Sequence, residues 1–295
     1  MSRHPFATTV WLVALSVVAA AATAAPWLGE RPPGLAPRVF APGVVSTGNI
    51  HSRLAISPDG RELFWNTVDT TTWTTRLVGC REVGGQWSAP ETPAFARGIS
   101  AQSPMFSPDG RRLYYQLLEA ETWTTVCVER LASGWSAPRR DGPMLNCGAS
   151  FTRSGRAYYS ARLAAKVWES GIFAGTLGPD GITAGAALDS TINVPGAIDY
   201  TPYVAPDESF LLFSSNRPAR GEREDMHVVV SFRAADGAWS APRRVSDIAG
   251  RFPSLSPDGR WLFFCGDDGN FYWMEAKALG ALRRPAAGGR KPAAH

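Results

Sequence analysis

Six polar residues stand at one place in a repeated sequence pattern, seven or eight positions before the Asp, or its equivalent Ser154, of a segment that reads Ser-Pro-Asp-Gly or a variant of it. They are His51, Gln102, Asn146, Asp199, Tyr200 and Arg251. If the repeats surround one axis, these side chains form a ring that could bind a peptide, a sugar or an ion. A ring that holds only water is also polar, so both interpretations stay open.

The composition of this ring favours binding over catalysis. Hydrolysis of a glycosidic bond uses two carboxylates, one as the acid and one as the base or nucleophile, whereas the ring contains only Asp199. We therefore predict no catalytic residue. The alternative is a carbohydrate-active hydrolase or lyase, in which Asp199 acts with a second acid that the spacing does not identify.

Metal and cofactor chemistry finds little support in the residue spacing. The four histidines and four cysteines form no transition-metal motif. Residues 267–270 read Asp-Asp-Gly-Asn, part of a calcium loop without the downstream ligands, so we expect a tight turn there. We expect no metal ligands and no cofactor. The alternative that a cation such as calcium is bound in the channel stays open. The sequence does not determine whether Cys80, Cys127, Cys147 and Cys265 form disulfides. A Cys127–Cys147 bond is one alternative.

A repeat organises the whole chain. SPDGR occurs at residues 57–61, 107–111 and 256–260, and the variants FTRSGR at 151–156 and VAPDES at 204–209 complete five units. A second motif, Trp-Ser-Ala-Pro, follows in phase in three units, and the third unit has GITAG at 181–185 instead. Periods of about 40–50 residues with several short strands are typical of a β-propeller. The third unit is either degenerate or specialised, because it lacks both motifs.

Each unit contains the parts of a four-stranded sheet. Apolar runs flank Ser-Pro-Asp-Gly, in which Pro presets φ, Asp bonds the backbone and Gly takes positive φ, so this segment predicts a hairpin turn. The Pro of Trp-Ser-Ala-Pro is tolerated at a sheet edge. We predict an all-β, five-bladed propeller of four-stranded antiparallel blades, with units near 50–91, 101–142, 146–190, 199–245 and 251–276. Six blades would require splitting residues 146–199, which are barely long enough for one unit.

The last unit lacks an outer strand of its own. Residues 36–42 resemble the start of such a strand. We therefore predict that this N-terminal segment supplies the fourth strand of the last blade, which would remove an open sheet edge.

Two further patterns concern aromatic and basic residues. TTWTT at 71–75 and ETWTT at 121–125 could form an aromatic platform for sugars, but their equivalent places in two units favour packing within or against the repeat. Arg217, in SSNRP at 214–218, is interpreted as structural and paired with a neighbouring acid.

The two ends of the chain differ in composition from its body. Residues 1–24 read as a cleavable secretory signal that is cut after Ala24. We expect the propeller domain at 25–285 and a disordered basic tail at 286–295. Because the net charge of +4 comes from the ends, we expect no nucleic-acid-binding face. The prediction is a periplasmic or secreted monomer without a transmembrane segment in the mature chain.

The chain resembles the TolB-like β-propeller repeat proteins of bacterial envelopes. The resemblance rests on SPDGREL, SPDGRRLYY, SPDGRWLFF and SSNRP, and it is closest to stand-alone secreted propellers that begin like FAPGVVST at 40–47 and end like FYWMEAKALGALR at 271–283. It covers nearly the whole mature chain. It implies a non-catalytic scaffold that binds an envelope protein or peptide, or a glycan, although a fold alone does not determine a function.

Overall fold

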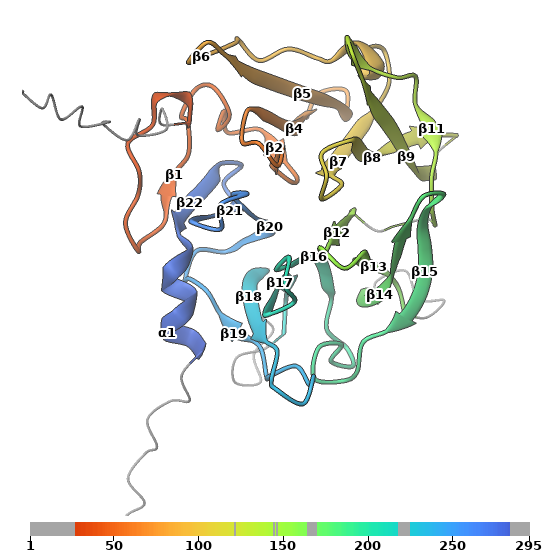
Figure 1. The fold of residues 1–295 in the computed structure, drawn as a ribbon. Helices are drawn as coiled ribbons and strands as arrows, with labels where there is room; N and C mark the ends of the chain where they lie inside the picture. The colour runs from red at the N-terminus through yellow and green to blue at the C-terminus, as the bar shows by residue number, and fades with distance from the viewer. Residues whose placement is uncertain are drawn as a thin grey trace, which may run out of the picture.

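The protein is a five-bladed β-propeller, as the repeat spacing predicts. The computed structural model describes residues 27–120, 122–143, 145, 147–163, 170–217 and 225–283. Five antiparallel sheets stand around a central axis, each with its first strand innermost (Figure 1). The predicted signal and the basic tail lie outside the described residues. Within the described part, no helix has the length and apolar character needed to cross a membrane.

The strands of each blade follow one another from the axis outward. Blade one consists of β2 (Ile50–His51), β3 (Ala55–Ile56), β4 (Glu62–Asp69), β5 (Thr74–Val83) and β6 (Gln86–Trp87). Blade two consists of β7 (Ala101–Phe106), β8 (Arg112–Glu119), β9 (Thr122–Leu131), β10 (Gly134–Trp135) and β11 (Arg139–Arg140). The first blade has its innermost strand interrupted between β2 and β3, and the second has its outermost strand interrupted between β10 and β11.

The other three blades have four uninterrupted strands each. They consist of β12 (Ala149–Phe151), β13 (Arg156–Arg162), β14 (Ser170–Gly178) and β15 (Gly181–Ala187), then β16 (Asp199–Val204), β17 (Phe210–Ser215), β18 (His227–Phe232) and β19 (Arg243–Arg244), and finally β20 (Gly250–Leu255), β21 (Trp261–Gly266), β22 (Phe271–Glu275) and β1 (Arg38–Val39). The described helical segments are short: η1 (Trp27–Gly29), η2 (Ala94–Ala96), η3 (Ala276–Ala278) and α1 (Leu279–Arg283).

The Ser-Pro-Asp-Gly segments are turns between the first and second strands of a blade, as predicted. In the first of them, Asp59 Oδ1 accepts the backbone N–H of Arg61 at 3.1 Å, and Gly60 has a φ of 72°. The segments at 107–110 and 256–259 repeat this arrangement. Every blade has a turn between its first and second strands, and we call the side of the propeller that carries these turns the turn face. We call the opposite side, where the innermost strands begin, the entry face.

A repeated hydrogen bond near the axis joins each blade to the next. The second strand of every blade places one polar or thiol residue after three apolar ones, and this residue bonds to the following blade. The five bonds join Asn66 Oδ1 to the Ser103 N–H (3.5 Å), the Gln116 amide to the Leu145 carbonyl, Ser160 Oγ to the Thr201 N–H (3.2 Å), Ser214 Oγ to the Phe252 N–H (3.0 Å), and the Cys265 thiol to the His51 carbonyl (3.6 Å). Together they form a closed ring of contacts between blades.

The N-terminal strand closes the last blade, which confirms the prediction made from residues 36–42. β1 pairs antiparallel with β22, so that Arg38 lies opposite Trp273 (Figure 1). The paired segment is shorter than predicted, but the next residue, Phe40, is fully buried and packs against Phe263 and Trp273. Both ends of the described chain therefore meet in one blade.

The third blade is specialised rather than degenerate. Its outermost strand, β15, has seven residues, whereas β6 and β19 have two each. Glycines allow β14 and β15 to approach closely, since a Cβ on Gly185 would lie 1.8 Å from the Ala174 carbonyl oxygen. The GITAG sequence therefore supports a long edge strand in place of Trp-Ser-Ala-Pro.

Candidate functional site

The innermost strands bring five of the six predicted ring residues to the entry face, but bulges alter the direction of the side chains. The strands β7, β16 and β20 each shift register directly after the predicted residue. Ser103, Thr201 and Phe252 have φ values of 53°, 53° and 59° at these places. Because a bulge turns neighbouring side chains to new directions, equal repeat positions do not give equal surroundings.

Asp199 is held by the chain segment that leads from blade three into blade four. Its side chain is 1% exposed, its Oδ1 accepts a hydrogen bond from Arg217 at 2.8 Å, and its Oδ2 accepts the Val194 N–H at 3.2 Å. Arg217 also donates to the carbonyls of Thr191 and Ile192. This confirms that Arg217 pairs with a neighbouring acid. Burial raises the pKa of Asp199, although Arg217 favours the carboxylate.

His51 is buried beneath the entry face. Its ring stacks on Phe271 with 5.1 Å between centroids, and its Nδ1 lies 2.8 Å from the Asn66 carbonyl oxygen. Its Nε2 is buried and has no hydrogen-bond partner. Burial lowers the pKa of this histidine, and the hydrogen bond to Asn66 opposes the shift only in part.

Acidification is therefore expected to destabilise the protein through His51. The unfolded chain binds a proton at this histidine near its ordinary pKa of about 6.5. The folded chain binds the same proton only at a lower pH. The stability that neutral His51 contributes is therefore lost as the pH falls below about 6.5. Urea unfolding at pH 7.5 and pH 5.5 measures the loss. A His51→Gln variant should lose less stability over this interval than the unmodified protein, and an equal loss in both would contradict the assignment to His51.

Tyr200 and Arg251 are the two ring residues that the structure brings together. The Arg251 guanidinium lies close enough to Tyr200 to favour its ionised form, and Arg251 also pairs with Asp267 at 2.5 Å. Burial raises the pKa of Tyr200, and the nearby guanidinium opposes this only in part. Of the remaining ring residues, Gln102 is half-buried and bonds to Gln116, while Asn146 lies outside the described residues.

Cys147 is a neighbour of this pair that the sequence analysis did not include in the ring. Burial raises the pKa of its thiol to about 11, although Arg53 and Arg251 favour the thiolate. The described cysteines form no disulfide, and the Cys127 thiol instead donates to the buried Asp141 Oδ2 at 3.1 Å. The proximity of Cys147 to Arg251 could have been found from the sequence, because the two residues have the same position in their repeats.

Trp73 stands on the entry face at the turn between β4 and β5, and it is 70% exposed. The turn is ordered, since Asp69 Oδ1 accepts the N–H groups of Thr71 and Thr72 at 2.9 and 3.2 Å, and these bonds lower the pKa of Asp69. Trp73 has a φ of 54°. The expectation that this tryptophan packs within or against the repeat is therefore wrong, whereas its counterpart Trp123 is half-buried.

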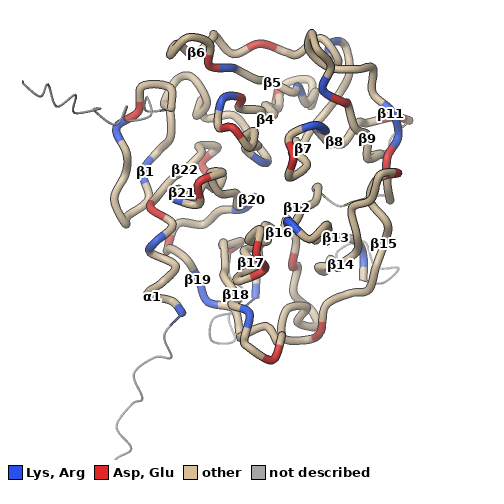
Figure 2. The backbone as a smooth tube through the Cα atoms, in the orientation of Figure 1, with Lys and Arg blue, Asp and Glu red and all other residues tan. Residues whose placement is uncertain are grey.

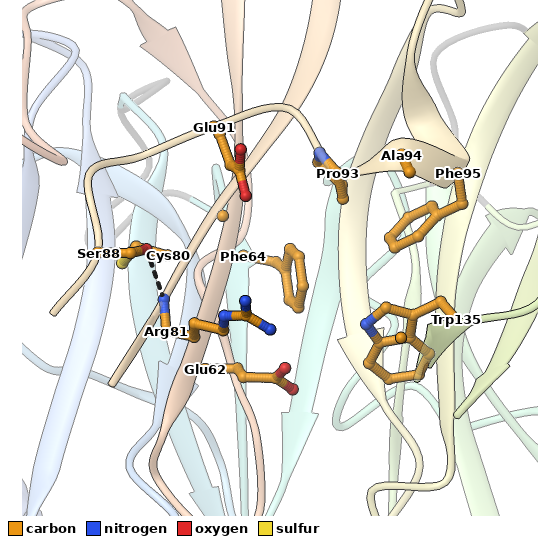
Figure 3. Close-up of a pocket in the computed structure, with 12 residues that line it drawn as sticks. Glu62, Phe64, Cys80, Arg81, Ser88, Glu91, Pro93, Ala94, Phe95 and Trp135 are labelled. Carbon is orange, nitrogen blue, oxygen red and sulfur yellow. Dashed lines mark hydrogen bonds between the residues drawn. The ribbon is translucent and has the colours of Figure 1, made fainter. Parts of the chain in front are cut away.

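A separate pocket of about 200 Å³ lies between blades one and two, away from the axis (Figure 3). Three aromatic rings form one side, with 6.1 to 6.4 Å between the centroids of Phe64, Phe95 and Trp135. Glu62 and Glu91 are also at the pocket (Figure 3). Such a combination of ring surfaces and carboxylate acceptors suits a ligand that has both an apolar face and hydroxyl groups.

Charged residues of both signs are spread over all five blades (Figure 2). Several of them are paired across strands, as Arg61 is with Glu82 and Arg140 with Glu119. Within the described residues, no group of three or more His, Cys, Asp or Glu side chains is placed to hold a metal ion. Positive and negative side chains are thus interspersed along the described chain and in part paired with one another.

The comparison with one solved structure supports the fold. A TolB-like protein from Agrobacterium tumefaciens has a TM-score of 0.50 and 18% identity, over 76% of this chain and 72% of its own. The chain is also similar to a gluconolactonase from Xanthomonas campestris, with a TM-score of 0.46 and 15% identity over 83% of this chain and 97% of that protein. Its similarity to an aldose sugar dehydrogenase from Streptomyces coelicolor has a TM-score of 0.46 and 12% identity, over 82% of this chain and 98% of that protein. No protein-family model and no curated protein matches the chain.

Proposed function

We propose that this protein is a non-catalytic binding module of the bacterial envelope, which recognises a protein or peptide with its entry face. The supporting observation is Trp73, a large apolar side chain that lies on an ordered turn and is exposed to solvent. Exposed aromatic residues of this kind are typical of positions that pack against a partner. The envelope location rests on the signal-like residues 1–24, and similarity in fold to a TolB-like protein agrees with it.

Other residues of the entry face extend this surface. Ile50 and Leu163 are 46% and 39% exposed at the ends of strands that reach the same face. Tyr200 and Arg251 lie nearer the axis and are half-buried. Tyrosine, tryptophan and arginine are the residues most enriched among those that dominate binding energy at interfaces, so these side chains are the expected anchors.

Photo-cross-linking from position 73 tests this proposal. The mature protein, with a photoreactive amino acid at residue 73, is expected to capture one partner stoichiometrically from the envelope of the producing cells. A Trp73→Ala substitution should weaken binding of that partner at least about tenfold, as truncation of a central aromatic contact does. Residue 83 is the matched control, because Val83 is 65% exposed at the turn-face end of β5. Equal capture from both positions would contradict an entry-face interface.

A glycan is the second candidate ligand, and the aromatic pocket between blades one and two favours it. Phe64, Phe95 and Trp135 offer ring faces, and Glu62 and Glu91 can accept hydrogen bonds from sugar hydroxyls. A Phe95→Ala variant distinguishes the two surfaces in the same experiment. Loss of ligand binding in Phe95→Ala, with normal binding in Trp73→Ala, would assign recognition to the pocket rather than to the entry face.

A further inference from the structure

Arg53 is a buried cation near the axis of the propeller. It is 3% exposed, and its Nη1 and Nη2 donate to the carbonyls of Ala149 and Pro202, both at 3.0 Å. The guanidinium thus reaches from the first blade to the third and fourth. Burial lowers the pKa of Arg53 to about 10, so the side chain remains protonated at neutral pH.

The surroundings of Arg53 leave part of its hydrogen-bonding capacity unused. An arginine has five N–H donors, and the two bonds to carbonyls use two of them. Its Nε is buried without a hydrogen-bond partner, and the ion pairs among the described residues do not include Arg53. Burying a cation without a counter-charge is costly, so an anion beside Arg53 would stabilise this arrangement.

A cavity of about 280 Å³ lies against Arg53 on the side of the turn face. All five blades contribute to its lining, and four exposed prolines of the turns surround its mouth: Pro58, Pro108, Pro206 and Pro257. Its walls contain both polar and apolar residues, and Met105, Phe106 and Leu255 are among the apolar ones. In the third blade the exposed Arg153 takes the place of the proline, which adds a second positive charge at the mouth.

Ser254 gives the cavity a second polar group that lacks a partner. Ser254 lines the cavity from β20, and its Oγ is buried without a hydrogen bond. Two residues that line the cavity therefore each have one buried donor without a partner, Arg53 Nε and Ser254 Oγ. A few placed polar groups in an apolar pocket are typical of small-molecule sites, and guanidinium and hydroxyl donors together suit a carboxylate.

We propose that this cavity is a binding site for an apolar monocarboxylate, whose carboxylate group bonds to Arg53 and Ser254 and whose apolar part lies against Met105, Phe106 and Leu255. The size of the cavity agrees, because an apolar cavity of about 150 Å³ already holds benzene. This site lies on the opposite side of the propeller from Trp73 and does not depend on the function proposed for the entry face.

Calorimetric titration of the mature protein with benzoate, and with the neutral benzamide as its matched control, tests the site. Benzoate is expected to bind saturably, and benzamide at least about tenfold more weakly, as follows from loss of a charged hydrogen bond. Ser254→Ala should weaken benzoate about tenfold, and Arg53→Met should remove the preference for benzoate over benzamide. Arg61→Gln, which changes an exposed arginine outside the cavity, should bind benzoate normally.

Three results would overturn the proposal: no saturable binding of benzoate, equal affinity for benzoate and benzamide, or benzoate binding that Ser254→Ala leaves unchanged. The last comparison does not need Arg53→Met to fold. A short peptide with a free C-terminal leucine, titrated beside its amide, identifies the source of the carboxylate. If the free-acid peptide binds more tightly than benzoate, the natural ligand is a protein C terminus; if it binds more weakly, it is a free acid.

Discussion

Deletion of residues 36–42 is expected to unfold the whole propeller rather than to loosen one strand. The deletion removes β1, exposes the edge of β22 and takes Phe40 out of a cluster with Phe263 and Trp273. Replacing a buried phenylalanine by alanine alone costs about 3–5 kcal/mol. This is a large part of the free energy of unfolding of a typical protein, which is about 5–15 kcal/mol. Urea unfolding followed by tryptophan fluorescence measures the loss.

Single substitutions separate closure from a general effect of truncation. Phe40→Ala should lower the unfolding free energy by about 3–5 kcal/mol. Leu35→Ala should change it by less than about 0.5 kcal/mol, because Leu35 is 55% exposed just before the closing segment. A protein without residues 36–42 that unfolds at the urea concentration of the full-length chain would show that closure does not hold the blades together.

Replacement of Asp199 by alanine is the second substitution expected to be severe. It removes the acceptor of the Val194 N–H and leaves Arg217, whose side chain is 16% exposed, without its carboxylate. Breaking a buried ion pair on one side costs about 3–5 kcal/mol. The matched control is Asp267→Ala, because the Arg251–Asp267 pair is 37% exposed on both sides, and exposed pairs contribute at most about 1 kcal/mol.

Asp199→Asn is expected to behave differently from Asp199→Ala. Because burial raises the pKa of Asp199, the folded protein binds this proton more tightly than the unfolded chain does. The stability that the neutral carboxyl contributes is therefore complete below the ordinary pKa of about 3.9 and is lost as the pH rises through the raised value. Asparagine keeps an oxygen that can accept a hydrogen bond but has no charge to pair with Arg217, so this variant should lose less stability at pH 7 than Asp199→Ala does. Equal losses in the two variants would contradict this account.

The same variant examines the alternative that the protein is a carbohydrate-active enzyme. If a hydrolase or lyase activity exists and depends on Asp199, a folded Asp199→Asn protein loses turnover. If the carboxylate only fastens the segment between blades three and four, the variant keeps whatever binding or activity the protein has. The hydrogen bonds of Asp199 to Val194 and Arg217 favour the second result.

Much of the architecture could be predicted because it depends on spacing along the chain. The Ser-Pro-Asp-Gly turns, the five units and the closing strand follow from local chemistry and a regular period. The ring of bonds between blades also has a sequence signal, since three apolar residues precede Asn66, Gln116, Ser160, Ser214 and Cys265. It was missed because a polar residue within a strand does not reveal whether its partner lies in the same blade or the next.

The repeat pattern is sufficient to predict five antiparallel blades, the turns between their strands and the use of an N-terminal strand in the last blade. Tertiary contacts bring Asp199 to Arg217, leave Trp73 exposed while Trp123 is half-buried, and bury Arg53 near the axis, and the repeat pattern predicts none of these. The physical reason is that a turn or a strand depends on a few adjacent residues. The burial and partners of a side chain depend on neighbours that reach it from other blades.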